Sequence, residues 1–549
     1  MRLAKVQSLR AVFGLLTLAI ISSAVQALGA TEGIRWNFGN GMDGAAPEAG
    51  PILDKRGNLY GTTATGGADV GPSGGGTVFE LTPNGDESIL WNFGNGADGA
   101  FPAGGLITDK RGNLYGTTAT GGAYGSGTVF KLTPPSTDGE NWTESILWNF
   151  NSNGTDGYNP RAGVIMDTRG NLYGTTQLGG ADAGSSSGGT VFKLTPPATI
   201  GGNWTESILW NFGGYSTDGA EPETSLITDE EGNLYGTTTG GGAYKAFLPP
   251  FFDGTVFKLT PPATIGGNWT ESILWNFGNG NDGNTPFAGL IKDKSGNLYG
   301  TTYFGGAQGA YGYGTVFELM PPSISGGNWT ESILWNFDGD DGSNPLAGLL
   351  MDPSGNLYGT AENDGTYFGG TAFELTPPST SQGSWTEAIL WSFGDGTDGK
   401  FPGGLIMNTG GKLFGTTGGG GVYNDISAEG SDAGGTVFEI SKGQPQILLK
   451  ATKIVFPDTA LGSTSTAKLM VQNIGAAQLI GTVNIPPAPF GIRGPTSFSL
   501  APTTGTTITL TFTPAALRLS SKIDTVVSNA VNHPVGHLEL QGTGAAPSP

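Results

Sequence analysis

Aspartates that recur in glycine-rich loops are the residues of this chain best suited to bind a metal ion. An Asp-Gly pair follows each of seven Trp-Asn-Phe-like phrases, at Asp43, Asp98, Asp156, Asp218, Asp282, Asp341 and Asp398. Two of these loops hold further acids, and calcium prefers several hard oxygen ligands of this kind. A calcium site would therefore use Asp340, Asp341, Asp395 and Asp398. The alternative needs no cofactor, because an Asp in a tight turn also accepts hydrogen bonds from its own backbone.

Aromatic side chains in three loops form the second candidate site. These loops carry Phe247, Phe251 and Phe252, then Tyr303, Phe304, Tyr311 and Tyr313, and then Tyr367 and Phe368. Exposed rings beside acids can stack on sugars or anchor a protein partner. The expected ligand is therefore a carbohydrate or an extracellular or envelope protein. The alternative is that the rings pack on the glycines of their own loops.

The chain offers few groups for catalysis. Its two histidines, His533 and His537, lie near the C-terminus, and it contains no cysteine, so the repeats cannot use imidazole or thiol chemistry. The strands expected at the centre of the repeat domain begin with Ala or Gly, and only Glu223-Thr224-Ser225 is polar. We therefore expect no enzymatic activity. The alternatives are a calcium-assisted hydrolase or lyase that uses the loop carboxylates, and a purely structural repeat protein.

The candidate loops belong to a unit that recurs every 55 to 65 residues. Its first phrase begins at Trp36, Trp91, Trp148, Trp210, Trp275, Trp335 and Trp391. Each copy leads to a phrase like Gly-Leu-Ile-x-Asp-x-x-Gly-Asn-Leu-Tyr-Gly-Thr-Thr and then to one like Gly-Thr-Val-Phe-x-Leu-Thr. Short apolar runs bounded by Gly, Pro and Asp predict four strands per unit, and a β-propeller is the natural closed assembly of such units.

The two ends of the repeat region predict how the ring closes. Residues 34–38 form a lone fourth strand, whereas the last unit has only three strands of its own, at 405–407, 412–417 and 435–440. The N-terminal strand can complete the last blade and remove two exposed sheet edges. The predicted fold is all-β, with a seven-bladed β-propeller over residues 31–444.

The repeated phrases Trp-Asn-Phe and Gly-Asn-Leu-Tyr-Gly-Thr-Thr resemble a known family. They are similar to the Gloeo/Verruco (GloVer) repeat of bacterial choice-of-anchor tandem-repeat proteins, and the order of the phrases resembles NHL-type propellers. The resemblance covers residues 33–441 and all seven units. It implies an exported bacterial protein but no particular activity.

Residues 445–549 lack the repeat, and their short strands with Gly, Pro and Asn turns predict an immunoglobulin-like β-sandwich. The phrases at 471–475, 510–514 and 540–544 (Val-Gln-Asn-Ile-Gly, Leu-Thr-Phe-Thr-Pro and Leu-Gln-Gly-Thr-Gly) resemble the ASH/HYDIN and choice-of-anchor D type of domain. That resemblance implies a spacer or an interaction module.

The N-terminus and the charge of the chain bear on where it acts. Residues 1–30 read as a secretory signal peptide, in which Arg2, Lys5 and Arg10 precede an apolar stretch over 11–21. No later segment is apolar enough to span a bilayer. The chain has a net charge of −21, and its repeats are more acidic than the chain as a whole, so they would repel nucleic acid. We expect a monomeric, non-enzymatic binding or scaffold protein in the periplasm, at the cell surface or in the medium.

Overall fold

The computed structural model describes residues 30–546, apart from residues 41, 69–74, 138–139, 182–187, 200, 214–216, 245–252, 265, 310, 325, 381–382, 424–433, 444–446, 474–476, 478, 485, 501–503 and 531–534. The named elements of this part of the chain are all β-strands. None of the described residues forms a helix with the length and hydropathy that crossing a membrane requires.

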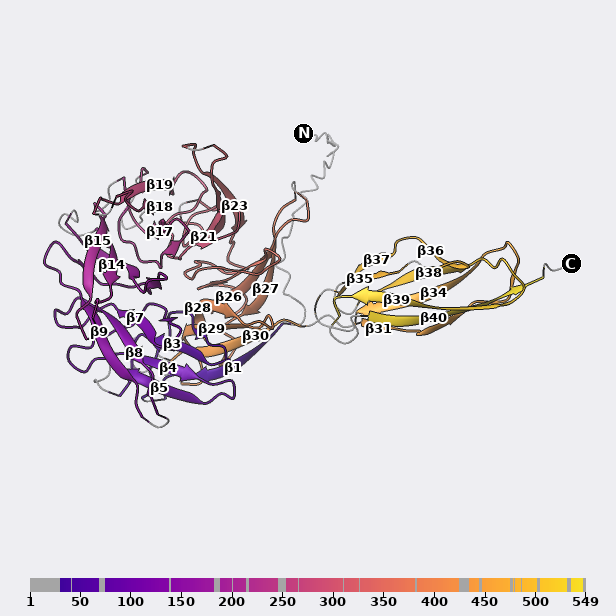
Figure 1. Ribbon diagram of the computed structural model, residues 1–549, viewed down its shortest axis with the longest axis horizontal. Helices are drawn as coiled ribbons and strands as arrows, with labels where there is room; N and C mark the ends of the chain where they lie inside the picture. Colours follow the sequence, from indigo (N-terminus) through magenta and orange to yellow (C-terminus); the bar gives the residue numbers. More distant parts are fainter. Residues whose placement is uncertain are drawn as a thin grey trace, which may run out of the picture.

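Within these residues, seven four-stranded sheets surround a common centre and form a β-propeller (Figure 1). The first sheet contains β2 (Ile52–Leu53), β3 (Leu59–Thr63), β4 (Thr77–Leu81) and β5 (Glu87–Asn92). The second contains β6 (Ile107–Thr108), β7 (Leu114–Thr118), β8 (Thr128–Thr133) and β9 (Thr143–Asn149). The third contains β11 (Ile165–Met166), β12 (Leu172–Thr176), β14 (Thr190–Thr195) and β15 (Thr205–Asn211).

The remaining four sheets follow the same order from the innermost to the outermost strand. The fourth contains β16 (Ile227–Thr228), β17 (Leu234–Thr238), β18 (Thr255–Thr260) and β19 (Thr270–Asn276). The fifth contains β20 (Ile291–Lys292), β21 (Leu298–Thr302), β22 (Thr315–Met320) and β23 (Thr330–Asn336). The sixth contains β24 (Leu350–Met351), β25 (Leu357–Ala361), β26 (Thr371–Thr376) and β27 (Thr386–Ser392). The seventh contains β28 (Lys400–Met407), β29 (Leu413–Gly419), β30 (Thr436–Ser441) and β1 (Thr31–Asn37).

The seventh sheet closes the ring as the repeat pattern predicted. Strand β1 pairs antiparallel with β30, from Thr31 opposite Ser441 to Asn37 opposite Thr436. On the inner side, the Thr416 hydroxyl donates a hydrogen bond of 3.0 Å to the carbonyl oxygen of Ala49 in the loop that leads to the first sheet. The predicted all-β fold, with an N-terminal strand that completes the last blade, is confirmed.

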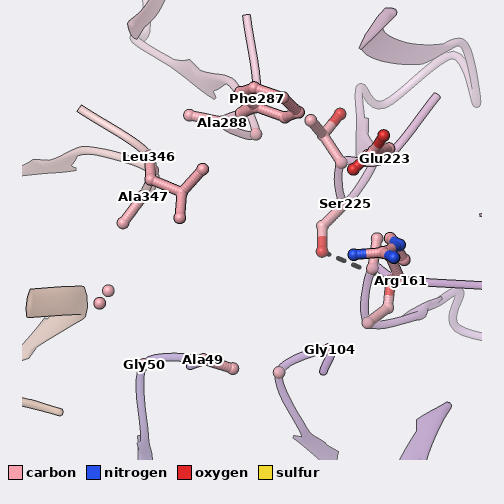
Figure 2. A pocket seen from close by; sticks show the side chains of 18 of the residues that line it. Ala49, Gly50, Gly104, Arg161, Glu223, Ser225, Phe287, Ala288, Leu346 and Ala347 are labelled. Carbon is pink, nitrogen blue, oxygen red and sulfur yellow. Dashed lines mark hydrogen bonds between the residues drawn. The ribbon is translucent and has the colours of Figure 1, made fainter. Parts of the chain in front are cut away.

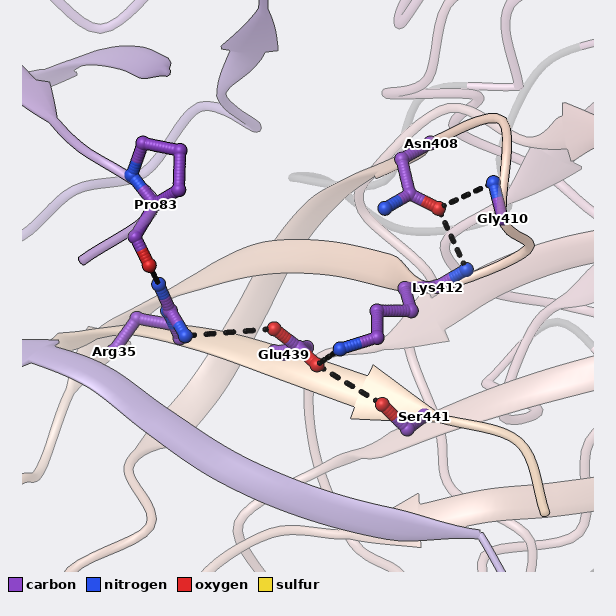
Figure 3. A network of polar contacts seen from close by, with 7 residues as sticks. All are labelled: Arg35, Pro83, Asn408, Gly410, Lys412, Glu439 and Ser441. Carbon is purple, nitrogen blue, oxygen red and sulfur yellow. Dashed lines mark hydrogen bonds and ion pairs between the residues drawn. The ribbon is translucent and has the colours of Figure 1, made fainter. Parts of the chain in front are cut away.

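Charged side chains reinforce this closure (Figure 3). Glu439 of β30 forms ion pairs with Arg35 of β1 and with Lys412, while Arg35 also donates a hydrogen bond to the carbonyl oxygen of Pro83 in the first sheet. Burial alone would raise the pKa of Glu439, but the hydrogen bonds from Lys412 and Ser441 and the charges of Lys412 and Arg35 lower it. These contacts link β1 to β30 within the seventh sheet and to Pro83 of the first sheet.

Neighbouring sheets pack through a repeated pair of phenylalanines. The ring of Phe93, which ends the Trp-Asn-Phe phrase, lies 4.9 Å from the ring of Phe130 in the next blade, and both are fully buried. Equivalent pairs with centroid distances of 4.8–5.3 Å occur at the other interfaces: Phe38–Phe79, Phe150–Phe192, Phe212–Phe257, Phe277–Phe317, Phe337–Phe373 and Phe393–Phe438. Burial of these rings is a main source of the stability of the ring of blades.

The strand directions divide the propeller into two faces. The loops that lead into each innermost strand and the loops between the second and third strands share one face, which we call the loop face. The hairpins between the first and second strands lie on the opposite face. Because Thr31 and Ser441 pair there, the chain joins and leaves the propeller on the face opposite the loop face.

The hairpins of the opposite face are fixed by an aspartate at the start of the Asp-x-x-Gly-Asn pattern. Asp109 accepts hydrogen bonds from the backbone N–H groups of Arg111 and Asn113, from the Asn113 amide and from the Tyr115 hydroxyl. These bonds outweigh the effect of burial and lower the pKa of Asp109. A side chain held in this way fixes the turn.

The C-terminal part is a sandwich of two sheets around its own core. One sheet contains β31 (Ile447–Leu449), β34 (Ser465–Asn473), β38 (Gly505–Phe512) and β36 (Phe490–Arg493). The other contains β32 (Lys453–Val455), β40 (Val535–Ala545), β39 (Leu519–Ser528), β35 (Leu479–Val483) and β37 (Ser497–Leu500), and β33 (Thr459–Ala460) pairs with β40. Leu469, Leu510, Phe512 and Leu538 are fully buried between them. The expected domain boundary at 444/445 falls outside the described residues.

Candidate ligand-binding site

The Asp-Gly aspartates close their own loops. One carboxyl oxygen of each Asp accepts a hydrogen bond of 2.9–3.3 Å from a backbone N–H three to five residues earlier, as from Gly94 to Asp98 and from Asp338 to Asp341. In the last two repeats the Trp335 and Trp391 indoles also donate to Asp341 and Asp398, at 2.7 and 3.0 Å. This is the turn-closing role that was the alternative to a metal site.

The structure does not bring the four predicted calcium ligands together. Asp340 and Asp341 lie in the loop before the sixth sheet, whereas Asp395 and Asp398 lie in the loop before the seventh. Among the described residues, no group of three or more His, Cys, Asp or Glu side chains is arranged to hold a metal ion. Both oxygens of Asp341 already accept N–H donors, so the residues fit a turn better than a calcium cage.

A glutamate from the outermost strand lies near each of these aspartates. Burial, and next the charge of Asp98, raise the pKa of Glu144 to about 8. The same causes act on the other six glutamates, whose pKa values are about 7 to 9: Glu32, Glu87, Glu206, Glu271, Glu331 and Glu387. Each of the seven has at least one buried carboxyl oxygen that accepts no hydrogen bond from the described residues. We call these seven Glu–Asp contacts between neighbouring blades the acidic pairs.

The predicted aromatic residues fall into three groups. Phe247, Phe251 and Phe252 lie outside the described residues. Tyr303 and Phe304 are half-buried and stack edge to face at 4.7 Å, so they follow the packing alternative in part. The others are exposed: Tyr311 (63%), Tyr313 (38%), Tyr367 (47%) and Phe368 (78%).

Tyr313 and Phe368 line a groove on the loop face between the fifth and sixth repeats. The groove has a volume of about 670 Å³, and Asp338, Asp340 and Asp364 lie along it beside the two rings. Phe368 has a left-handed backbone with φ of 58°, a strained conformation for an aromatic residue. This groove combines the exposed rings and the carboxylates that the sequence placed on one face.

The central channel corrects one sequence-based expectation. Its mouth on the loop face forms a cavity of about 460 Å³, which Glu48, Arg161 and Glu223 line together with Phe287 and Leu346. Figure 2 shows Arg161, Glu223 and Ser225 on one side and Leu346 and Ala347 on the other, with Phe287 between these groups. The expectation of a nearly featureless wall was wrong, because the residue directly after the proline of each repeat also faces the channel.

Backbone hydrogen bonds between neighbouring blades hold these residues at the mouth. The residue before each proline has a left-handed backbone although it is not glycine: Ala46, Phe101, Asn159, Glu221, Thr285, Asn344 and Phe401, with φ of 53–60°. The N–H of Asn159 donates to the Ser126 carbonyl of the preceding blade, and its own carbonyl accepts the N–H of Gln177. These bonds offset a strain of about 1–2 kcal/mol per residue and aim the residue after the proline at the centre.

The fold and these sites define a tandem-repeat β-propeller protein. The Gloeobacter/Verrucomicrobia repeat matches residues 25–247 and 249–484, and the chain belongs to this repeat family. No curated protein matches the chain.

Similar solved structures are distant in sequence. A luciferin-regenerating enzyme is 12% identical at a TM-score of 0.36, over 75% of this chain and 95% of that chain. A protein of unknown function from Dyadobacter fermentans is also 12% identical at a TM-score of 0.36, over 75% and 100%. The ASH/PapD-like domain 7 of human CEP192 is 18% identical at a TM-score of 0.17, over 19% and 89%. At these identities and TM-scores, no functional role transfers to this chain.

Proposed function

We propose that this chain is an exported, non-enzymatic binding protein of the cell envelope or exterior, and that it binds carbohydrate. The observation that carries the proposal is the groove in which Tyr313 and Phe368 lie beside Asp338, Asp340 and Asp364. Aromatic faces pack on the C–H surface of a sugar ring, while carboxylates accept hydrogen bonds from its hydroxyls. The N-terminal segment with its basic head and apolar stretch supports export.

The exposure and the backbone strain of Phe368 favour a role in binding over a role in packing. Phe368 is 78% exposed and keeps an unfavourable backbone conformation, although packing within its own loop would hide the ring. An exposed aromatic ring that a ligand covers contributes strongly to affinity, often by more than about 2 kcal/mol. A purely structural repeat needs no such ring.

A glycan array with the mature protein tests the proposal. We expect at least one glycan class to bind, and expect Tyr313→Ala and Phe368→Ala each to weaken that binding by about tenfold or more. Tyr124→Ala is the matched control, because Tyr124 is 61% exposed in the equivalent loop of the second repeat but does not line the groove. Binding that survives both groove substitutions, or no binding to any glycan, would contradict the proposal; the latter result favours a structural role.

A further inference from the structure

The residues after the repeat prolines differ from blade to blade although the rest of the repeat is nearly constant. The first six repeats carry Glu48, Ala103, Arg161, Glu223, Phe287 and Leu346 at this position, and the seventh is one residue shorter, with Gly403 after its proline. All seven line the same cavity. A sevenfold repeat that served only to close the ring would have no need of six different residue types at this position.

The floor of the cavity is narrow and is made of backbone. A Cβ atom at Gly163 would lie 2.3 Å from the carbonyl oxygen of Gly105, and a Cβ atom at Gly50 would lie 2.7 Å from the backbone of Gly404. Side chains larger than hydrogen are therefore excluded at Gly50 and Gly163, whereas the equivalent position of the fourth repeat holds Ser225. The cavity is a cup at the loop face, and its volume of about 460 Å³ lies within the range of roughly 300–1,000 Å³ of small-ligand sites.

One wall of the cup is charged and is held in place by a hydrogen-bond network. The Gln177 amide donates to Glu223 at 2.6 Å, while its oxygen accepts hydrogen bonds from Arg161 Nε at 3.1 Å and from Asn159 at 2.6 Å. The Nε of Arg161 is therefore fixed. Partial loss of water inside the channel raises the pKa of both Glu48 and Glu223, that of Glu223 to about 7, and the charge of the Arg161 guanidinium lowers both in part.

Acidic groups outnumber basic ones around the cup. Glu362 of the sixth repeat accepts a hydrogen bond of 2.9 Å from the Tyr303 hydroxyl, and its charge raises the pKa of Glu48. Glu48, Glu223 and Glu362 are thus opposed by Arg161 alone among the charged residues that these contacts bring together. Of the charged residues that line the cavity itself, Glu48 and Glu223 are acidic and Arg161 is basic, so its lining has an excess of negative charge.

The other wall is apolar. Phe287 packs edge to face on Tyr303 at 5.3 Å, which fixes the orientation of its ring, and Leu346 is 39% exposed. A ring held in this way contacts an apolar group at little cost in side-chain entropy. A neighbouring aromatic face also attracts a cation, and the attraction grows when water is excluded.

We propose that the mouth of the channel is a second binding site, which takes a small organic cation: an ammonium group attached to an apolar or aromatic body. The ammonium group lies against the carboxylate of Glu48, and the body lies against Phe287 and Leu346. A hydrogen-bond acceptor on the ligand, where there is one, meets the guanidinium of Arg161. This site is independent of the carbohydrate groove.

Calorimetric titration of the full mature protein with 2-phenylethylammonium tests this site. We expect a dissociation constant of about 1 mM or lower, and expect 2-phenylethanol, which has the same body without the charge, to bind at least about tenfold more weakly. Glu48→Gln and Phe287→Ala should each weaken binding of the ammonium by a similar factor. Glu230→Gln, an exposed acid in a hairpin of the opposite face, and Tyr313→Ala in the groove should leave it unchanged.

Three outcomes would overturn the proposal. Equal binding of the alcohol and the ammonium would show a merely apolar pocket, and unchanged binding in Glu48→Gln would place the ammonium elsewhere. Binding of calcium chloride alone, lost in Glu48→Gln and without binding of the ammonium, would make the cup a metal site. Because Glu48 is exposed to solvent at the mouth of the channel, its substitution by Gln should leave the fold intact, and circular dichroism of each variant checks this.

Discussion

The outer interfaces between blades and the mouth of the central channel are built from the same repeat, yet they use it in opposite ways. At the outer interfaces the same acidic pair and the same pair of phenylalanine rings occur seven times. At the mouth, by contrast, neighbouring blades contribute Glu, Ala, Arg, Glu, Phe and Leu. Each outer interface has a structural task of its own, so the solution repeats, whereas the mouth is one cavity shared by all blades.

This difference also separates stability from recognition. The outer residues are buried between blades, and their chemistry affects the free energy of unfolding of the ring. The mouth residues are held in place by hydrogen bonds between backbone atoms, so their side chains can vary without loss of the fold. Four experiments test whether the two regions differ in this way.

Removal of β1 should have the largest effect, because both regions depend on a closed ring. Deletion of Thr31–Asn37 leaves β30 as an open edge and uncovers the apolar face that Ile34 and Trp36 cover. Each large apolar side chain that loses its burial costs about 1.5–3 kcal/mol, so the total approaches the whole stability of a domain, about 5–15 kcal/mol. The melting temperature of the propeller should fall steeply, and the protein should aggregate. A synthetic peptide of residues 31–40 added in trans should restore part of the loss; an unchanged melting curve would argue against closure by β1.

The second largest effect should come from pH, through the acidic pairs. Their glutamates have pKa values raised from about 4.5 to about 7–9 by burial and by the neighbouring Asp. A raised folded pKa means that folding binds protons, so the contribution is complete below the unfolded pKa and is lost as pH rises through the folded pKa. The free energy of unfolding of the propeller should therefore fall by several kcal/mol in total between pH 5 and pH 9. The melting temperature should fall with it. Scanning calorimetry measures the melting temperature at each pH. A melting temperature that stays constant or rises over this window would show that the glutamates of the acidic pairs do not have raised pKa values.

A single acidic pair provides a smaller and more specific test. Glu144→Gln replaces the protonated acid with a neutral group of the same shape, so it should be almost neutral at pH 5 and should stabilise the propeller by about 1–3 kcal/mol at pH 9. Urea denaturation at the two pH values measures the difference. Glu230→Gln is the matched control on the opposite face, where the side chain is exposed. Equal effects of both substitutions at both pH values would remove the acidic pairs as the source of the pH dependence.

The smallest effect on stability is expected at the mouth. Glu48→Gln and Leu346→Ala should each change the free energy of unfolding by less than about 0.5 kcal/mol, because both side chains are exposed to solvent. Urea denaturation at pH 7 measures it. A loss of more than about 2 kcal/mol from either substitution would show that the mouth, too, is built for stability, and the comparison would fail.

The repeat made the fold predictable, since features that occur in every unit support one another. The pattern Asp-x-x-Gly-Asn at Asp109 is typical of a hairpin turn, and the hydrogen bonds that Asp109 accepts show this turn in the structure. The closing role of β1 followed from counting strands at the two ends. The mutual position of Tyr313 and Phe368, one repeat apart, also followed from the unit, because equivalent loops of neighbouring blades share a face.

The sequence was less informative where the outcome depends on contacts between blades. Glu144 looks like an exposed residue of an outer strand, and only the approach of Asp98 from the preceding blade makes it an acidic pair. Glu48 and Arg161 were missed because the innermost strands are only two residues long in most blades, so alternation along the strand cannot tell which side chains face the channel. The signal that would have found them is the position after each proline, which varies although the proline is constant and the next two residues are mostly Ala or Gly.

Closure of the ring by its first strand also sets the order in which the protein can fold. Ala49 and Thr416, which are hydrogen-bonded in the closed ring, are 367 residues apart in the chain. During synthesis the first strand has no partner until the last repeat has left the ribosome, and such long-range pairing is slow. Until then the growing array carries an open edge at each end, which other chains can pair with. The propeller therefore becomes a single cooperative unit only when its synthesis is complete, and a chain cut short within the last repeat keeps both edges exposed.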